Sequence, residues 1–397
     1  MNILVVSSFL PYPLFSGGHI RLYQIIKRLS KNHSLTLVCE KRNYQTDDDV
    51  HELEKYCKEV IVVRRKKQWS LLTVGKTLFS LKPFLITGHT HEEMTRKIQE
   101  VMNKIKLDVI HAETFYIMQN IPKTTVPVVL VEHNIEYLVY ERFLQTVPFF
   151  LRPLLYLDIL KLKKVEKYFW KKATKLVAVS EEERDLMKRE DVVVVPNGVD
   201  LQEFRIQNLE FRIGGEKRVL FIGDFKWVQN RDALKWILRE IYPSFVKLFN
   251  GKTKLKLWVV GKNIPDSLRN MTNDTNVVFD ENAPADTEKI YQRADVLLAP
   301  IRVGGGTSFK ILEAMATGVP VIATSLGIEG IKARESKDFL LANTTDEFVR
   351  AIDSLLTNKK SYESLRMNAR KLIEENYNWD HIVKILDGVY QEAVKIS

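Results

Sequence analysis

The segment "GGGTSFKILEAMATGVPVIAT", residues 304–324, joins a glycine triplet to a helical stretch that is apolar on nearly every side. Lys310 and Glu313 are its only charged residues. Buried Lys and Glu are rare unless they are paired or bound to something. Because residues three apart share a helix face, these two charges either pair with each other or face one ligand together. Their spacing alone leaves both alternatives open.

The ligand that such a face suits is a nucleoside diphosphate. Free backbone N–H groups at a helix N-terminus bind anions, and the residues that would offer them here are Gly305, Gly306, Thr307 and Ser308. Lys310 would add a positive charge for the diphosphate. Glu313, about a turn later, would accept hydrogen bonds from the two ribose hydroxyls.

A second glycine pair follows the first predicted strand. We expect Gly17 and Gly18 to lie in a loop before a helix, where glycines let backbone N–H groups approach a phosphate. The spacing does not fit the G-x-G-x-x-G pattern of dinucleotide-binding proteins, which argues against a nicotinamide enzyme.

Three ionisable residues stand close to predicted strand ends in the first half. His133 and Glu136 come after the buried run "VPVVLV", and Glu113 ends the run "DVIHAE". We expect His133 to face a ligand and Glu113 to lie on a neighbouring strand, with a purely structural role as the alternative for each. Asn230, in "WVQNRDAL", is interpreted as a helix N-cap.

The elements that must position these residues alternate between strands and helices. Short, continuously apolar runs indicate strands buried on both faces of a parallel sheet. They cover residues 2–9, 34–39, 59–63, 108–113, 126–133, 175–180 and 192–198, and then 218–225, 254–262, 276–280, 295–301, 320–325 and 339–343. Helical patterns separate many of them, which predicts an α/β chain with two doubly wound sheets. We place an N-terminal domain at 1–205, a second at 206–378, and a final helix at 379–397.

Composition narrows the class of partner. The 397 residues carry a formal net charge of +10, and basic proteins bind nucleic acid, anionic membranes or anionic substrates. No nucleic-acid-binding signature is present, so we expect no nucleic-acid partner. Residues 62–69 and 149–173 mix basic, aromatic and leucine residues, which favours an anionic membrane surface; packed helices with a solvated basic face are the alternative.

The sequence also predicts a location. No apolar run reaches the roughly 18 residues that cross a bilayer, and residues 1–15 lack the basic region of a signal peptide. We therefore expect a cytoplasmic protein, peripheral at the inner face of the membrane. Cys39 and Cys57 are the only cysteines, and no cluster of Cys and His has the spacing of metal ligands.

Taken together, these segments resemble the retaining glycosyltransferases of family 4, which have the GT-B fold. The resemblance covers most of the chain, and its motifs are "SGG", "EHNIEY", "VVPNGVDLQEF", "VLFIGDFKWVQNRDAL" and, most specific, "GGGTSFKILEAMATGVPVIAT". It implies two Rossmann-like domains that face each other across a cleft. The N-terminal domain would bind the acceptor and the other a nucleotide-sugar, while the last helix would cross back to the N-terminal domain.

The resemblance also implies roles for individual residues. Glu313 matches the carboxylate that binds the ribose hydroxyls, and Gly17 and Gly18 match the loop against the donor diphosphate. His133 matches the histidine beside the reacting carbon of the donor sugar. Glu113 and Glu136 are assigned to the acceptor side.

Two departures from the family pattern affect donor recognition. Gly305 stands where a glutamate usually contacts the donor sugar, and Asp224 and Gln229 stand where an arginine and a lysine are usual. The segment resembles a branch of the family in which the helix lysine supplies the positive charge. Lys226 and Arg231 are further candidates for that charge.

The expected activity is therefore retaining transfer of a sugar from a nucleotide diphosphate sugar to a lipid-linked or glycan acceptor. His133 and Lys310 are the expected catalytic residues, and neither a metal nor another cofactor is required. The alternatives are a nucleotide-sugar epimerase or a phosphorylase of the same fold, or a degenerate sugar-nucleotide-binding protein without activity.

Overall fold

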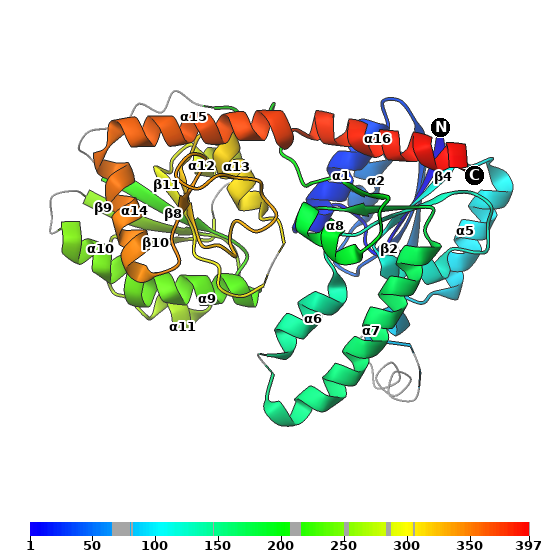
Figure 1. Cartoon of the computed structure of the whole chain (residues 1–397), viewed down its shortest axis with the longest axis horizontal. Helices are drawn as coiled ribbons and strands as arrows, with labels where there is room; N and C mark the ends of the chain where they lie inside the picture. Colours follow the sequence, from blue (N-terminus) through cyan, green and yellow to red (C-terminus); the bar gives the residue numbers. More distant parts are fainter. Residues whose placement is uncertain are drawn as a thin grey trace. The chain divides into compact units, whose positions relative to one another are not determined.

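The computed structural model describes residues 1–65, 80, 82–145, 147–206, 216–249, 254–282, 287–304 and 306–396. The chain divides into two compact units (Figure 1). The first unit comprises Met1–Pro196 with Trp379–Ser397, and the second comprises Asn197–Asn378. The sequence placed this division after residue 205 and treated residues 379–397 as a separate helix.

A seven-stranded parallel sheet forms the centre of the first unit, with the strand order β3-β2-β1-β4-β5-β6-β7. Its order reverses between β1 and β4, as in doubly wound sheets. The strands are β1 (Asn2–Ser7), β2 (Ser34–Lys41), β3 (Glu59–Arg64), β4 (Val109–Glu113), β5 (Val128–Val131), β6 (Lys175–Ala178) and β7 (Val192–Val194).

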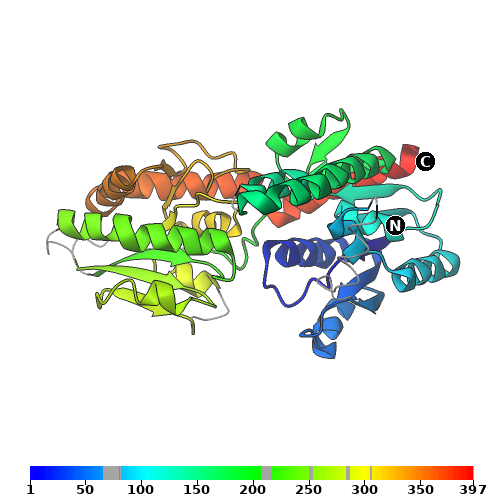
Figure 2. The same cartoon turned by 90° about the horizontal axis from the view of Figure 1, so that it is seen from below.

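The helices of the first unit lie around this sheet (Figures 1 and 2). They are α1 (Gly17–Leu29), α2 (Asp47–Glu54), α4 (Phe84–Gly88), α5 (Glu92–Lys104), α6 (Glu136–Leu144), α7 (Arg152–Lys172), α8 (Glu181–Met187) and α16 (Trp379–Ile396), with short 3₁₀ turns η1 (Phe115–Asn120) and η2 (Phe149–Leu151). The last helix, α16, contacts α1, β4 and β5.

The second unit contains a six-stranded parallel sheet of order β10-β9-β8-β11-β12-β13. The strands are β8 (Glu216–Ile222), β9 (Lys254–Val260), β10 (Val277–Asp280), β11 (Val296–Ala299), β12 (Val321–Ala323) and β13 (Leu340–Leu341). The helices are α9 (Val228–Trp236), a π-helical turn η3 (Ile237–Ile241), α10 (Tyr242–Phe249), α11 (Asp266–Arg269), α12 (Thr287–Tyr291), α13 (Phe309–Thr317), α14 (Thr345–Thr357) and α15 (Lys359–Asn376).

Both sheets confirm the predicted α/β class. Each continuous apolar run of the sequence overlaps one of the observed strands. The strands β5, β11 and β12 show the reason, because their central side chains are fully buried between helix layers. A strand with helices on both faces excludes polar side chains from its middle, so polar groups gather at its ends.

Two local expectations were wrong. Gly17 and Gly18 are not in a loop but are the first two residues of α1, with Ser16 as its N-cap. Asn230 is not an N-cap, because α9 already begins at Val228 and Trp227 occupies the N-cap position. Both helices begin earlier than the patterns of their side chains predict.

Candidate functional site

Helix α13 begins after a glycine turn that follows β11. Gly304 and Gly306 have φ angles of +104° and +91°, which favour glycine over other residues. Gly305 lies outside the described residues. Ser308 is the N-cap of α13, although its side chain forms no capping hydrogen bond, and the Thr307 hydroxyl donates to the Gly330 carbonyl at 3.5 Å. The first N–H groups of α13 therefore have no side-chain cap at Ser308.

Lys310 is held by a neutral amide. Its ammonium donates to the Asn230 side-chain oxygen at 3.0 Å and lies 5.2 Å from the centre of the Phe221 ring. Burial lowers the pKa of Lys310 to about 8, and the nearby Glu313 charge opposes this shift only in part. The ammonium is thus a positive charge that no carboxylate contacts directly within the described residues.

Glu313 is held by a phenol. The Tyr291 hydroxyl donates to the Glu313 carboxyl at 2.8 Å, and the Tyr291 side chain is completely buried. Burial raises the pKa of Glu313 to about 7, although Tyr291 and Lys310 act to lower it. In the described part of the second unit no salt bridge joins Lys310 to Glu313. The ion pair that the sequence left open is therefore not formed, and each group has its own neutral partner.

Asn230 connects Lys310 to the turn after β8. Its side-chain N–H donates to the Asp224 carbonyl at 2.9 Å, while its side-chain oxygen accepts from Lys310. A Cβ at Gly223 would lie 2.6 Å from the Asn230 amide nitrogen, so only glycine permits this close approach. The amide is consequently fixed in orientation between the two partners.

The other two candidate cations are engaged by the same turn. The Lys226 ammonium pairs with the Asp224 carboxylate at 2.8 Å. Arg231 donates from one guanidinium nitrogen to the carbonyls of Phe225 and Lys226, at 2.9 and 2.7 Å. Of the three candidates, Lys310 is the one held by a neutral side chain, that of Asn230 in α9.

The first unit brings His133 and Glu113 together. Glu113 is the last residue of β4 and pairs in register with Val131 of β5, so His133 emerges beside it. The His133 ring is hydrogen-bonded to one carboxyl oxygen of Glu113, and the His111 ring to the other. Burial acts to raise the pKa of Glu113, but the two histidines hold it well below its usual range. Glu113 is therefore a buried anion that fixes the His133 ring.

Two more residues complete this arrangement. The Tyr390 hydroxyl of α16 lies 2.6 Å from His111 Nδ1, which continues the chain of contacts to the C-terminal helix. A Cβ at Gly18 would lie 3.3 Å from His133 Cε1 and Nδ1. Gly18 therefore lets the start of α1 approach the histidine ring closely. Neither His111 nor Tyr390 was identified from the sequence, and "HAE" with its i, i+2 spacing on a strand was the available signal for His111.

Glu136 lies apart from Glu113 in its contacts. It is the first residue of α6, and its backbone N–H donates to the Glu166 carboxyl of α7 at 2.8 Å. Burial raises the pKa of Glu136 to about 7. Burial also raises the pKa of Glu166, to about 8.

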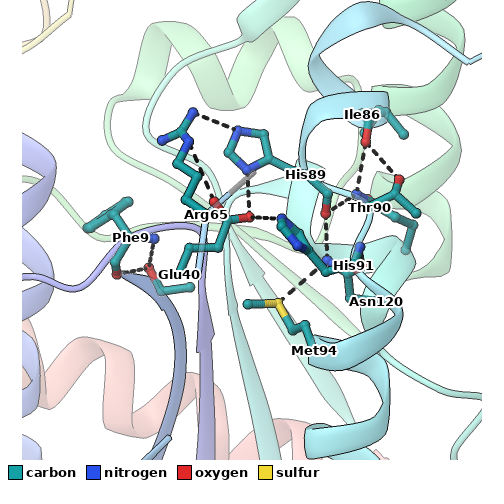
Figure 3. A network of polar contacts seen from close by, with 11 residues as sticks. Phe9, Glu40, Arg65, Ile86, His89, Thr90, His91, Met94 and Asn120 are labelled. Carbon is teal, nitrogen blue, oxygen red and sulfur yellow. Dashed lines mark hydrogen bonds and ion pairs between the residues drawn. The ribbon is translucent and has the colours of Figure 1, made fainter. Parts of the chain in front are cut away.

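A further polar cluster in the first unit was missed by the sequence analysis (Figure 3). Glu40, near the end of β2, lies 2.9 Å from His89 Nδ1 and 3.1 Å from His91 Nε2, with Arg65 Nε at 3.7 Å. Burial acts to raise the pKa of Glu40, but hydrogen bonds from the histidines lower it. Four residues from three separate segments meet here, which no local pattern indicates.

The described residues provide neither a cluster of metal ligands nor a membrane-spanning helix. In the described ranges, no group of three or more His, Cys, Asp or Glu side chains is arranged to hold a metal ion. None of the described helices is both long enough and apolar enough to cross a membrane.

Comparison with known proteins extends these observations. Residues 15–203 match Glycosyltransferase Family 4, and residues 216–358 match Glycosyl transferases group 1. An uncharacterised 44.6 kDa protein of the cps region of Klebsiella pneumoniae is 22% identical over 98% of this chain and 99% of that protein. An uncharacterised glycosyltransferase of Methanocaldococcus jannaschii is 29% identical over 52% of this chain and 55% of that protein.

Solved structures share the fold. Sucrose-phosphate synthase from Thermosynechococcus elongatus superposes with a TM-score of 0.71 at 16% identity, over 100% of both chains. Anabaena HepE, in complex with UDP and glucose, superposes with a TM-score of 0.66 at 15% identity, over 99% of this chain and 100% of that chain.

The contact between Tyr291 and Glu313 generates a stability prediction. Tyr291→Phe removes the phenol donor from a buried carboxyl, so it should lower the free energy of unfolding by about 1–3 kcal/mol. The pKa of Glu313 should rise further, because the lost hydrogen bond lowers it at present. A raised carboxyl pKa makes the folded state less stable as pH increases. The loss should therefore be larger at pH 8 than at pH 5, as measured by urea unfolding.

Tyr242→Phe is the matched control for this measurement. Tyr242 donates to Asp274 at 2.7 Å, but Asp274 is only partly buried and also accepts from the backbone and side chain of Asn276. We expect a smaller loss with little dependence on pH. Equal losses for the two variants at every pH would show that the Glu313 carboxyl does not depend on Tyr291.

Proposed function

Since the chain belongs to the glycosyltransferases of group 1 and family 4, we propose that it transfers a sugar from a nucleotide diphosphate sugar to a lipid-linked or glycan acceptor, with retention at the anomeric carbon. Its two doubly wound sheets are those of the GT-B fold. The observation that carries the proposal is the pair of ionisable groups on α13, each held by a neutral partner.

Lys310 is assigned to the donor diphosphate. A departing diphosphate gains negative charge in the transition state, and a fixed positive group aimed at that charge contributes strongly to catalysis. Asn230 orients the ammonium without neutralising it. The N–H groups at the start of α13, near Gly306, Thr307 and Ser308, would add partial positive charge.

Glu313 is assigned to the ribose hydroxyls of the donor. A carboxylate accepts hydrogen bonds from both hydroxyls of a diol, and Tyr291 fixes the orientation of this one through a single oxygen. Hydroxyl donors favour the ionised carboxylate. Donor binding should therefore lower the raised pKa of Glu313.

His133 is assigned to the reacting end of the donor sugar, on the acceptor-binding unit. Its Nε2 is engaged by Glu113, which leaves Nδ1 as the ring nitrogen to face substrate. The proposed reaction is a front-face displacement through an oxocarbenium-like state, and the Glu113–His133 pair would stabilise that positive charge.

UDP is the first nucleotide to test, and the membrane is the proposed site of action. Anabaena HepE, which is similar in fold, was solved with UDP and with UDP-glucose. The basic net charge of +10 supports work at an anionic surface. We propose a peripheral location at the cytoplasmic face.

Donor binding should release protons to the solution at one pH and take them up at a higher pH. Near pH 6.5, Glu313 is largely protonated because its pKa is about 7, and contact with the ribose should release a proton. Near pH 8.5, Lys310 is largely uncharged because its pKa is about 8, and the diphosphate should cause proton uptake. The numbers of protons released and taken up can be measured by calorimetric titration with UDP-glucose in buffers that differ in ionisation enthalpy.

Each residue has its own control in that experiment. Glu313→Gln should abolish the release near pH 6.5 and keep the uptake near pH 8.5, whereas Lys310→Met should do the reverse. Binding of UDP-glucose with unchanged proton exchange in both variants would assign the donor to other residues.

The same two residues should differ in steady-state kinetics. Lys310→Ala should lower kcat by roughly 10²–10³, because the lost charge acts mainly in the transition state. Glu313→Gln should mainly raise the donor KM, because ribose contacts change little during the reaction. Near-normal kcat for a cooperatively melting Lys310→Ala protein would transfer the catalytic charge to Lys226 or Arg231.

Transfer should proceed without a divalent metal. The proposed positive charges are Lys310 and the N–H groups of α13, so EDTA should leave the rate of donor turnover unchanged. Loss of activity with EDTA and its return with Mn²⁺ would contradict this proposal.

A further inference from the structure

Helices α6 and α7 form a hairpin that extends away from the sheet of the first unit (Figure 1). Helix α7 contains 21 residues, which corresponds to a length of about 30 Å. We call the end far from the sheet the hairpin tip and define it by Phe143, η2 (Phe149–Leu151), Leu154 and Leu157.

The hairpin tip exposes large apolar side chains. Phe149 and Phe150 are 79% and 67% exposed, and their rings contact each other with centres 5.8 Å apart. Phe143, Leu154 and Leu157 are each more than half exposed. Clustered apolar exposure of this kind on a soluble domain marks an interaction surface.

The charged residues of the tip itself are basic. The sequence contains no Asp or Glu between Glu141 and Asp158. Arg152 lies at the tip and donates to the Val147 carbonyl at 2.9 Å. Further along α7, exposed lysines follow at Lys164, Lys167, Lys171 and Lys172. The hairpin is therefore apolar at its tip and carries exposed lysines along the second half of α7.

The base of the hairpin is fixed beside His133. Helix α6 begins three residues after it, at Glu136. The Glu166 carboxyl of α7 accepts the backbone N–H groups of Glu136 and Tyr137, at 2.8 and 3.1 Å. Trp170, also on α7, donates to Glu132 at 2.9 Å. A partner bound at the tip is thereby held at a set distance from His133.

We infer that the hairpin tip inserts its Phe and Leu side chains into the interfacial layer of an anionic bilayer, and that α7 lies along the bilayer surface so that its exposed lysines reach the lipid head groups. Apolar and aromatic residues next to exposed lysines suit that layer. Two copies meeting tip to tip would bring their Arg152 side chains together, which opposes self-association through this surface. The inference rests on the membrane location in the proposed function and specifies the surface responsible.

Vesicle binding by a tip variant tests the inference. Phe149→Ser combined with Phe150→Ser should weaken binding to vesicles of phosphatidylglycerol and phosphatidylcholine by about tenfold or more, because two exposed rings no longer enter the lipid. Leu248→Ser with Met367→Ser, at residues 53% and 56% exposed in the second unit, is the matched control and should bind as wild type does.

Measurements at high salt distinguish insertion of the apolar tip from electrostatic attraction of the lysines to the lipid surface. Wild-type protein should keep part of its vesicle binding at high salt, because insertion is not screened, whereas the tip variant should lose all of it. Lys164→Gln with Lys171→Gln should remove mainly the salt-sensitive part. In addition, Phe150→Trp should become sensitive to quenching by brominated lipid beyond the level of the wild-type tryptophans.

Two outcomes would overturn the inference. One is sedimentation of the tip variant with anionic vesicles to the same extent as wild type. The other is a changed mass of the tip variant in solution with unchanged vesicle binding, which would make the tip a protein–protein contact. Hydrolysis of UDP-glucose without vesicles should be equal in wild type and tip variant. Absence of hydrolysis in both would count against the proposed activity and leave the vesicle result to decide the role of the tip.

Discussion

Each carboxylate buried at the end of a parallel strand must receive hydrogen bonds, and the polar contacts of the first unit follow from this requirement. Glu113 is met by two histidines, Glu40 by two more, and Glu132 by an indole N–H. A buried polar group without a hydrogen bond destabilises the folded state by more than a formed hydrogen bond stabilises it. Since the donors come from distant segments, these bonds also tie the segments together: Tyr390 joins α16 to β4 through His111.

The kind of donor decides what the carboxyl can do. Histidines stabilise the anion of Glu113, so its pKa is low and its charge is constant over the neutral range. Tyr291 is a weaker, neutral donor that does not offset burial, so the pKa of Glu313 rises to about 7. Glu113 is thereby suited to holding a histidine in place, and Glu313 to responding to a ligand.

The sequence was sufficient to predict the strands and the proximity of two residues of the candidate site. Continuous apolar runs located every observed strand, and the rule that polar groups gather at strand ends brought Glu113 and His133 to adjacent strands. The sequence did not reveal which side chains contact the candidate residues Lys310 and Glu313. Asn230 lies 80 positions from Lys310 and Tyr291 lies 22 from Glu313, and side-chain spacing carries information only over a turn or two.

The same limit explains the misplaced start of α1. Gly17 and Gly18 are permissive residues that disfavour a helix by propensity, yet they begin α1 because Gly18 must pass within van der Waals contact of His133. Tertiary packing outweighed a local preference worth about 1 kcal/mol per glycine.

The departures from the usual family pattern acquire a physical meaning in these contacts. Where a cation would be usual, Asp224 holds Lys226 in an ion pair, and Arg231 donates to two backbone carbonyls. Both charges are thus already engaged. Among the described residues, Lys310 contacts only the Asn230 amide and the face of the Phe221 ring, and its burial without a directly contacting anion lowers its pKa. A bound diphosphate would stabilise the charged form of Lys310 by placing an anion next to it. In the proposed function, Lys310 therefore becomes fully protonated when the donor is bound.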